Sequence, residues 1–317
     1  PTEPVDDGVA TITCQPGDAE YITRSELNTM IANGDPVEDV CTSGIMDFVA
    51  LFIGHVEFNQ DISRWDVSNG RNFGQMFNGA KSFDQDISDW DVSNGVSFRG
   101  MFSYASSFDK DIGSWDVSNG QDFANMFFSA EVFDQDIGDW DVSNGRNFSS
   151  MFDSAESFNQ PIGDWDVSNS EDFVMMFFRA KSFNQDIGDW DVSKAASFSS
   201  MFQDAVKFDQ DIGDWDVSSG EYFGGMFASA TSFSQDIGAW DVSNGISFSG
   251  MFKGASAFNQ DIGNWDVSNG EDFDEMFYDA LNFDQDISGW KTSNAEDWEY
   301  FKDGSALTDA HTPPKFL

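Results

Sequence analysis

Ten tryptophans recur along this chain at intervals of 25 residues, with no insertion or deletion between them: Trp65, Trp90, Trp115, Trp140, Trp165, Trp190, Trp215, Trp240, Trp265 and Trp290. The columns that begin at Phe58 and Ile62 keep the same register. A fixed period of this length is the signature of stacked repeats, in which each unit contacts mainly its neighbours. The chain is therefore predicted to form a solenoid, which needs no single large core.

One unit, residues 58–82, contains two apolar patterns. Ile62, Trp65 and Val67 have the L-x-x-L-x-L spacing of a leucine-rich repeat, which predicts a short strand. A second stripe is spaced i, i+3, i+4 and i+7, and it consists of Phe73, Met76, Phe77 and Ala80. That spacing predicts a short amphipathic helix.

These patterns predict an α/β solenoid, a leucine-rich-repeat-like right-handed coil of about ten 25-residue strand-helix units with a parallel sheet and terminal caps. Strands would lie about 4.8 Å apart, over stacked Trp, Phe and Met side chains. The strand face is expected to be concave and to bind ligands. We divide the chain into an N-terminal cap (1–46) with a capping helix at 23–33, a repeat solenoid (47–290), and a C-terminal cap and tail (291–317).

Acidic residues outnumber basic ones by 57 to 15, which gives a formal net charge of −42. Such a surface repels nucleic-acid phosphates and anionic lipids, and it attracts divalent cations, basic proteins or a cationic polymer. No apolar run approaches the roughly 20 residues of a membrane-spanning helix. We therefore expect a protein or cationic-polymer partner, or a second copy of the chain, and neither nucleic acid nor membrane insertion. Solubility in a salty medium would explain the same charge.

Two cysteines, Cys14 and Cys41, precede the repeats, and their spacing fits neither a redox nor a zinc motif. A disulfide between them would close a loop for which chain entropy predicts roughly 3 kcal/mol of stabilisation, and it would indicate an oxidising compartment. Two buried free thiols are the alternative. Because the chain begins at Pro1, we expect a processed chain or a piece of a longer one.

The unit F-N/D-Q-D-I-S/G-x-W-D-V-S-N, followed by M-F-x-x-A-x-x-F, resembles the BspA-type leucine-rich-repeat surface protein family over roughly residues 47–301. Members are typically extracellular or cell-surface proteins tied to adhesion or partner binding. The resemblance implies that compartment and a non-enzymatic role. This chain departs from the family pattern at Gly70 and its equivalents, where Val is common, and at Phe73 and its equivalents, where Met is common.

Columns of aspartate run along the predicted solenoid. The strand column is Asp66, Asp91, Asp116, Asp141, Asp166, Asp191, Asp216, Asp241 and Asp266. The turn column is Asp61, Asp86, Asp111, Asp136, Asp186, Asp211, Asp236, Asp261 and Asp286, and it is interrupted by Pro161. A partial column adds Asp89, Asp139, Asp164, Asp189 and Asp214.

Carboxylates stacked about 5 Å apart repel one another by roughly 1 kcal/mol per pair in water. Three effects could offset this cost. Turn aspartates are expected to accept backbone N–H bonds. Strand aspartates, with fewer such donors, are candidates to bind a basic partner or Ca²⁺, although no calcium-loop motif is present and no cofactor is expected to be required. Salt could also screen both columns.

The Asn69 column is predicted to form an internal amide ladder that bonds to neighbouring backbone, and Asn147 begins a single glycosylation sequon. The only histidines, His55 and His311, are far apart in a stack, and no nucleophile, phosphate-binding or zinc motif occurs, so we predict that the protein is not an enzyme. Two functions remain open. One is a cell-surface module that binds proteins through an acidic face, and the other is a structural subunit of an extracellular filament or coat.

Overall fold

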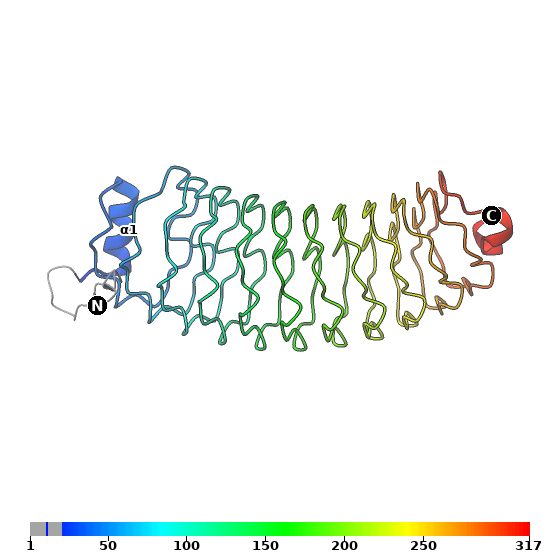
Figure 1. Cartoon of the computed structure of the whole chain (residues 1–317), viewed down its shortest axis with the longest axis horizontal. Coiled ribbons are helices and arrows are strands. Elements are labelled where there is room, and N and C mark those ends of the chain that lie inside the picture. The colour runs from blue at the N-terminus through cyan, green and yellow to red at the C-terminus, as the bar shows by residue number, and fades with distance from the viewer. Residues whose placement is uncertain (1–10, 12–20) are drawn as a thin grey trace, which may run out of the picture.

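The computed structural model describes Thr11 and residues 21–317, and residues 21–317 form an elongated stack of similar coils with the helix at residues 24–33 at one end and the C-terminal residues at the other (Figure 1). Its helices are α1 (Arg24–Asn33) and two 3₁₀ turns, η1 (Asp309–His311) and η2 (Pro314–Phe316). No helix in this described part is long and apolar enough to cross a membrane. The repeat solenoid predicted from the 25-residue period is therefore present.

Neighbouring coils are joined by single parallel β-bridges. From α1 onward the bridged residues are Asp47, Asn72, Ser97, Asp122, Asn147, Asp172, Ser197, Tyr222, Ser247, Asp272 and Asp297. The bridge residue of the unit 58–82, Asn72, follows the last predicted strand residue, Val67, and lies at the start of the predicted helix. Within the described coils, neither that strand nor that helix forms, which corrects the strand-helix unit expected from the sequence.

The backbone around each bridge alternates between two hydrogen-bond partners. The N–H groups of Phe73 and Gln75 donate to the next coil, at 2.9 Å and 2.8 Å, whereas the N–H of Met76 donates back to the carbonyl of Phe73 at 3.1 Å. Phe77 and Gly79 continue the outward bonds at 2.8 Å each. We call residues 71–79 and their equivalents in each coil the ladder segment.

Left-handed backbone makes this alternation possible. Gln75 has φ 56° and Gly79 has φ 73°, and the same two positions have positive φ in coil after coil. An α-helix requires negative φ throughout, so it cannot form here. The stripe that predicted a helix is nevertheless fully buried, because two successive tight turns, closed at Met76 and Ala80, also bring every third and fourth side chain inward.

The coils are closest together along the ladder segment. Equivalent ring centroids are 5.5 Å apart at Phe77 and Phe102, and 6.5 Å apart at Trp90 and Trp115. Under one repeated screw operation, displacement grows with distance from the screw axis, so the ladder lies on the inner side and the tryptophans on the outer side. The aspartates beside the tryptophans are therefore on the outer side, not on the concave side that the sequence analysis expected.

The two departures from the BspA-type pattern, glycine at position 70 and phenylalanine at position 73 of the unit, have one packing explanation. A Cβ atom on Gly70 would lie 2.4 Å from Cζ of Phe73, so the glycine makes room for the phenylalanine ring. Ser170 and Ala195 fill the same slot in two later coils. The centroid of Phe173, which follows Ser170, is 6.3 Å from that of Phe148 and 6.3 Å from that of Phe198, which follows Ala195, compared with 5.3–5.7 Å between the other neighbours.

Gly95→Ala should therefore lower the free energy of unfolding by about 1–3 kcal/mol, the usual cost of overpacking. Its new Cβ would lie 2.4 Å from Cζ of Phe98. Gly289→Ala is the matched control, because nothing lies within 4 Å of the Cβ it would add and its φ is ordinary. Urea unfolding followed by tryptophan fluorescence measures both, and equal effects of the two substitutions would contradict the packing account.

The first coil is capped by α1, which lies where the sequence predicts a capping helix. Thr23 and Glu26 form a capping box at its start, and Gly34 ends it with φ 75°. The Arg24 guanidinium donates to the carbonyls of Asp47 and Val49, the latter at 2.6 Å. In later coils the equivalent carbonyls accept N–H groups of the preceding coil, so Arg24 replaces the coil that is missing.

The opposite end is closed by aromatic packing. The Phe316 ring of η2 lies 4.7 Å from Phe301 and 5.6 Å from Trp298, centroid to centroid. Cys41 is fully buried and pairs with Tyr21 in a parallel bridge. Cys14 lies outside the described residues, so the Cys14–Cys41 disulfide stays a prediction.

Candidate binding surface

All eighteen aspartates of the two full columns make the same local turn. Oδ1 of Asp66 accepts the N–H of Ser68 at 3.1 Å and its hydroxyl at 2.6 Å. Oδ1 of Asp61 accepts the N–H of Ser63 at 3.0 Å. The other members of each column do likewise at 2.9–3.1 Å. Backbone bonding was expected for the turn column only; the strand column has it too.

The turn that carries Asp66 is fastened to the preceding coil on both sides. The Trp65 indole N–H donates to the carbonyl of Val37 at 2.9 Å, and the Asn69 amide donates to the carbonyl of Ser43 at 2.9 Å. The same pair of bonds recurs along the stack, as at Trp90 and Asn94. The predicted bonding of the Asn69 column to neighbouring backbone is thus confirmed, but these asparagines are exposed and do not form the internal ladder expected from the sequence. On this side of the stack, hydrogen bonds from side chains join neighbouring coils, whereas in the ladder segment backbone hydrogen bonds join them.

These turns hold ionised carboxylates in place. The hydroxyl and the backbone N–H of the following serine lower the pKa of Asp116 and of Asp191. For Asp241 the same two donors lower the pKa, and the opposing effect of the Asp266 charge is the smallest of the contributions. At Asp241 the donors therefore outweigh the repulsion from its neighbour in the column. Except for the half-buried Asp66, the side chains of both columns are exposed.

Shallow acidic hollows separate successive coils beside these columns. One, of about 230 Å³, is lined by Asp61, Ser63, Gln85, Asp86 and Asp89. A similar one of about 220 Å³ is found at Pro161, where the turn column is interrupted. Across Thr11 and residues 21–317, no group of three or more His, Cys, Asp or Glu side chains is arranged to hold a metal ion. Calcium binding at the strand column stays a prediction.

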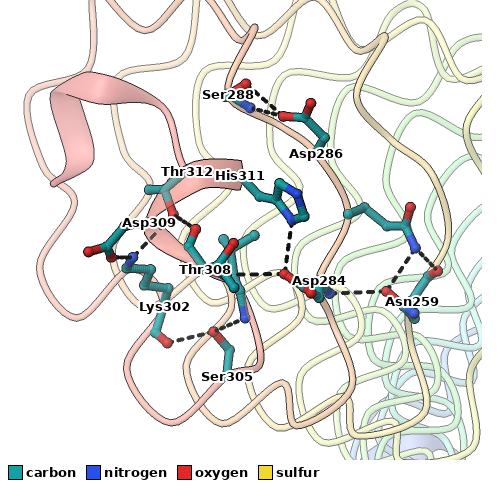
Figure 2. A network of polar contacts seen from close by, with 12 residues as sticks. Asn259, Asp284, Asp286, Ser288, Lys302, Ser305, Thr308, Asp309, His311 and Thr312 are labelled. Carbon is teal, nitrogen blue, oxygen red and sulfur yellow. Dashed lines mark hydrogen bonds and ion pairs between the residues drawn. The ribbon is translucent and has the colours of Figure 1, made fainter.

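The remaining candidate residues lie apart from these columns. Asn147 is a half-buried bridge residue whose Oδ1 accepts the N–H of Ser149 at 3.0 Å, and its glycosylation stays a prediction. His55 is exposed in the first coil. In Figure 2, His311 contacts Asp284 through Nδ1, at 3.0 Å from Oδ1. This contact lowers the pKa of Asp284 and belongs to the closure of the last coil.

The contact with His311 ends a further chain of side-chain bonds between coils. The N–H of Asp284 donates to Oδ1 of Asn259 at 3.0 Å, and Oδ1 of Asp284 accepts the N–H of Thr308 at 3.3 Å (Figure 2). The same bond links Asp84 to Asn59 near the other end of the stack, at 3.0 Å. A bonding role for this column was not predicted from the sequence, although an Asn or Asp directly before Gln recurs at this position in most coils.

One protein-family model, described as "Mycoplasma protein of unknown function, DUF285", matches three overlapping stretches, residues 24–138, 121–237 and 207–312. The chain belongs to this family. The matches extend from α1 through the coils into the C-terminal cap, and the family description assigns no function. No curated protein matches the chain.

Two solved structures are similar over most of this chain. An internalin from Listeria monocytogenes is 10% identical, with 90% of each chain covered and a TM-score of 0.25. The second, titled a TLR13–ssRNA13 complex, is 8% identical, with 90% of this chain and 53% of that chain covered and a TM-score of 0.21. Likeness this weak bears on neither the function nor the detail of the coils.

The lowered aspartate pKa values predict the effect of acid on stability. The stability from these turns is complete above the ordinary aspartate pKa of about 4 and is lost as the pH falls through the lower pKa of the folded state. The thermal midpoint should therefore stay level at neutral pH and fall below about pH 4. Removing the hydroxyl donors in Ser118→Ala, Ser193→Ala and Ser243→Ala together should make that fall shallower. A midpoint that rises on acidification would contradict this assignment.

Proposed function

We propose that this protein is an extracellular or cell-surface repeat scaffold that binds a basic protein segment through its acidic outer face, defined as the Asp66 and Asp61 columns. The observation that carries the proposal is that every carboxylate in these columns is fixed by one oxygen. The turn holds Oδ1 and leaves Oδ2 without a partner in that turn, so the face presents a regular, preorganised row of negative charge. A partner would meet these groups already ordered, which reduces the entropic cost of binding.

The spacing of the row favours one class of partner. Each tryptophan from Trp65 to Trp265 directly precedes an aspartate of the Asp66 column, and in seven neighbouring pairs the tryptophan ring centroids are 6.4–6.5 Å apart, a measure of the coil spacing on this side. An extended peptide advances about 3.3 Å per residue, so alternate side chains are about 6.6 Å apart. A strand with Lys or Arg at every second position would therefore keep register with the carboxylates over several coils. Each pair contributes little alone, and affinity would come from their number.

The location rests on different observations. The resemblance to BspA-type surface proteins and the predicted disulfide both favour an oxidising compartment outside the cytoplasm. Adhesion through the acidic face is consistent with that location. The structural-subunit alternative predicts visible fibres in a purified sample, whereas the binding proposal does not require them.

A four-site variant tests the proposed face: Asp116→Asn, Asp141→Asn, Asp166→Asn and Asp191→Asn. Asparagine can accept the same turn bonds, so the fold should be retained while four charges are lost. The matched control removes four acidic charges from the ladder segments: Glu171→Gln, Glu221→Gln, Glu271→Gln and Glu296→Gln. The probe is a synthetic peptide of alternating lysine and serine, compared by titration calorimetry with a peptide of the same composition whose lysines are contiguous.

The outer variant should lose about tenfold or more in affinity for the alternating peptide, and the control should lose much less. The alternating peptide should also bind the unaltered chain more tightly than the contiguous one. Equal losses in both variants would show attraction to overall charge only and would contradict the proposal. Titrations repeated in EDTA and in Ca²⁺ show whether calcium assists, because calcium held between the columns would change the affinity more than Mg²⁺ does.

A further inference from the structure

The exposed side chains of the ladder segments form a second surface, which we call the ladder face. It comprises residues 46–54, 71–79, 96–104, 121–129, 146–154, 171–179, 196–204, 221–229, 246–254, 271–279 and 296–304. The outer columns repeat one residue type, but ladder-face positions differ from coil to coil: the site of Gly79 holds Tyr104, Arg179 and Asp204 in other coils. Backbone hydrogen bonds hold the ladder segments together, so their exposed side chains are not needed to join the coils and are available to contact a partner.

Apolar side chains are concentrated on the ladder face. Of eleven large hydrophobic residues exposed in the described part of the chain, six lie on it: Met46, Ile53, Tyr104, Met175, Tyr222 and Tyr300. Near the N-terminal end, the rings of Tyr104 and Phe128 meet edge to face at 5.0 Å, beside a hollow of about 270 Å³ that Arg99 also lines. Tyrosine, methionine and arginine are the side chains enriched in protein interfaces.

Charge on the ladder face is divided between its two ends. The four ladder segments from 71–79 to 146–154 hold three arginines, Arg71, Arg99 and Arg146, and two aspartates. One of those aspartates, Asp153, is buried. The last two segments hold one lysine and nine acidic residues: Glu271, Asp272, Asp274, Glu275, Asp279, Glu296, Asp297, Glu299 and Asp303. The basic end stands out in a chain whose net charge is −42.

A face that is basic at one end and acidic at the other complements itself when two copies lie antiparallel. Each arginine-bearing end then meets an acidic end, and the two contacts are equivalent, as a twofold interface requires. A parallel pairing would place like charges together. The acidic outer face offers no such match, because two copies meeting there would repel each other.

We propose that two copies of this chain associate through their ladder faces, antiparallel, with the arginine end of each against the acidic end of the other. The exposed Met175 and Tyr222 lie between these ends, and Tyr104 and Tyr300 lie within them, so apolar contact is available along the ladder face. This dimer leaves the outer face open, so it does not depend on the function proposed above.

Charge exchange tests the dimer. The first variant reverses the basic end with Arg71→Glu, Arg99→Glu and Arg146→Glu. The second reverses the acidic end with Glu271→Lys, Glu296→Lys, Asp297→Lys, Glu299→Lys and Asp303→Lys, all at exposed positions, which leaves lysines in excess of acidic residues there. The control reverses three exposed aspartates of the outer side, Asp139→Lys, Asp164→Lys and Asp189→Lys. Sedimentation velocity across a range of concentrations gives the association state of each full chain, and circular dichroism and thermal melting confirm that each variant is folded.

The unaltered chain and the control should both reach twice the monomer mass of 35.2 kDa. Each charge variant alone should dissociate at concentrations about tenfold higher or more, because like charges then meet at both ends. An equimolar mixture of the two variants should form a heterodimer, since both ends match again. An unaltered chain that stays monomeric, variants that dimerise normally, or a mixture that fails to pair would each overturn the proposal.

Discussion

The coil-to-coil hydrogen bonds of the ladder segment are the constraint on which the rest of this structure depends. In each coil, alternate N–H groups from Phe73 to Gly79 bond to the next coil, and those between them close tight turns. Every second donor is thus committed between coils, and φ must be positive at the two positions that permit the alternation. These bonds set the spacing of the coils, and that spacing brings equivalent aromatic rings of neighbouring coils into contact.

The two sides of the stack are held by different means, and this difference accounts for their surfaces. On the inner side, backbone bonds join the coils and leave the exposed side chains free to vary. On the outer side, the indole of Trp65 and the amide of Asn69 join the coils, and the local turn at Asp66 lies between these two bonds, so these residue types recur. Regular negative charge therefore marks the outer side, and varied side chains mark the inner one.

The sequence predicted the solenoid, its buried columns, the capping helix and the bonding of Asn69, because each depends on residue type at a fixed spacing. It did not predict the ladder. The stripe Phe73, Met76, Phe77 and Ala80 reports which side chains are buried, and two tight turns bury the same four as a helix would. A signal was present: glycine recurs at the two positive-φ positions, as in Gly100 and Gly254, where an amphipathic helix disfavours it. The turn column was predicted correctly, whereas the bonds at Asp66 were missed because its segment was expected to be a strand.

Amide hydrogen exchange measured residue by residue tests the ladder most directly. We expect slow exchange at Phe123, Asn125 and Phe127, whose N–H groups bond to the next coil at 2.9–3.0 Å. We expect faster exchange at Asp141 and Val142, because in the described coils no backbone bond joins these two residues to a neighbouring coil. Far-UV circular dichroism on the same sample should lack a strong helical signal. A strong helical spectrum together with protected amides at Asp141 and Val142 would contradict the ladder and restore a strand-helix unit.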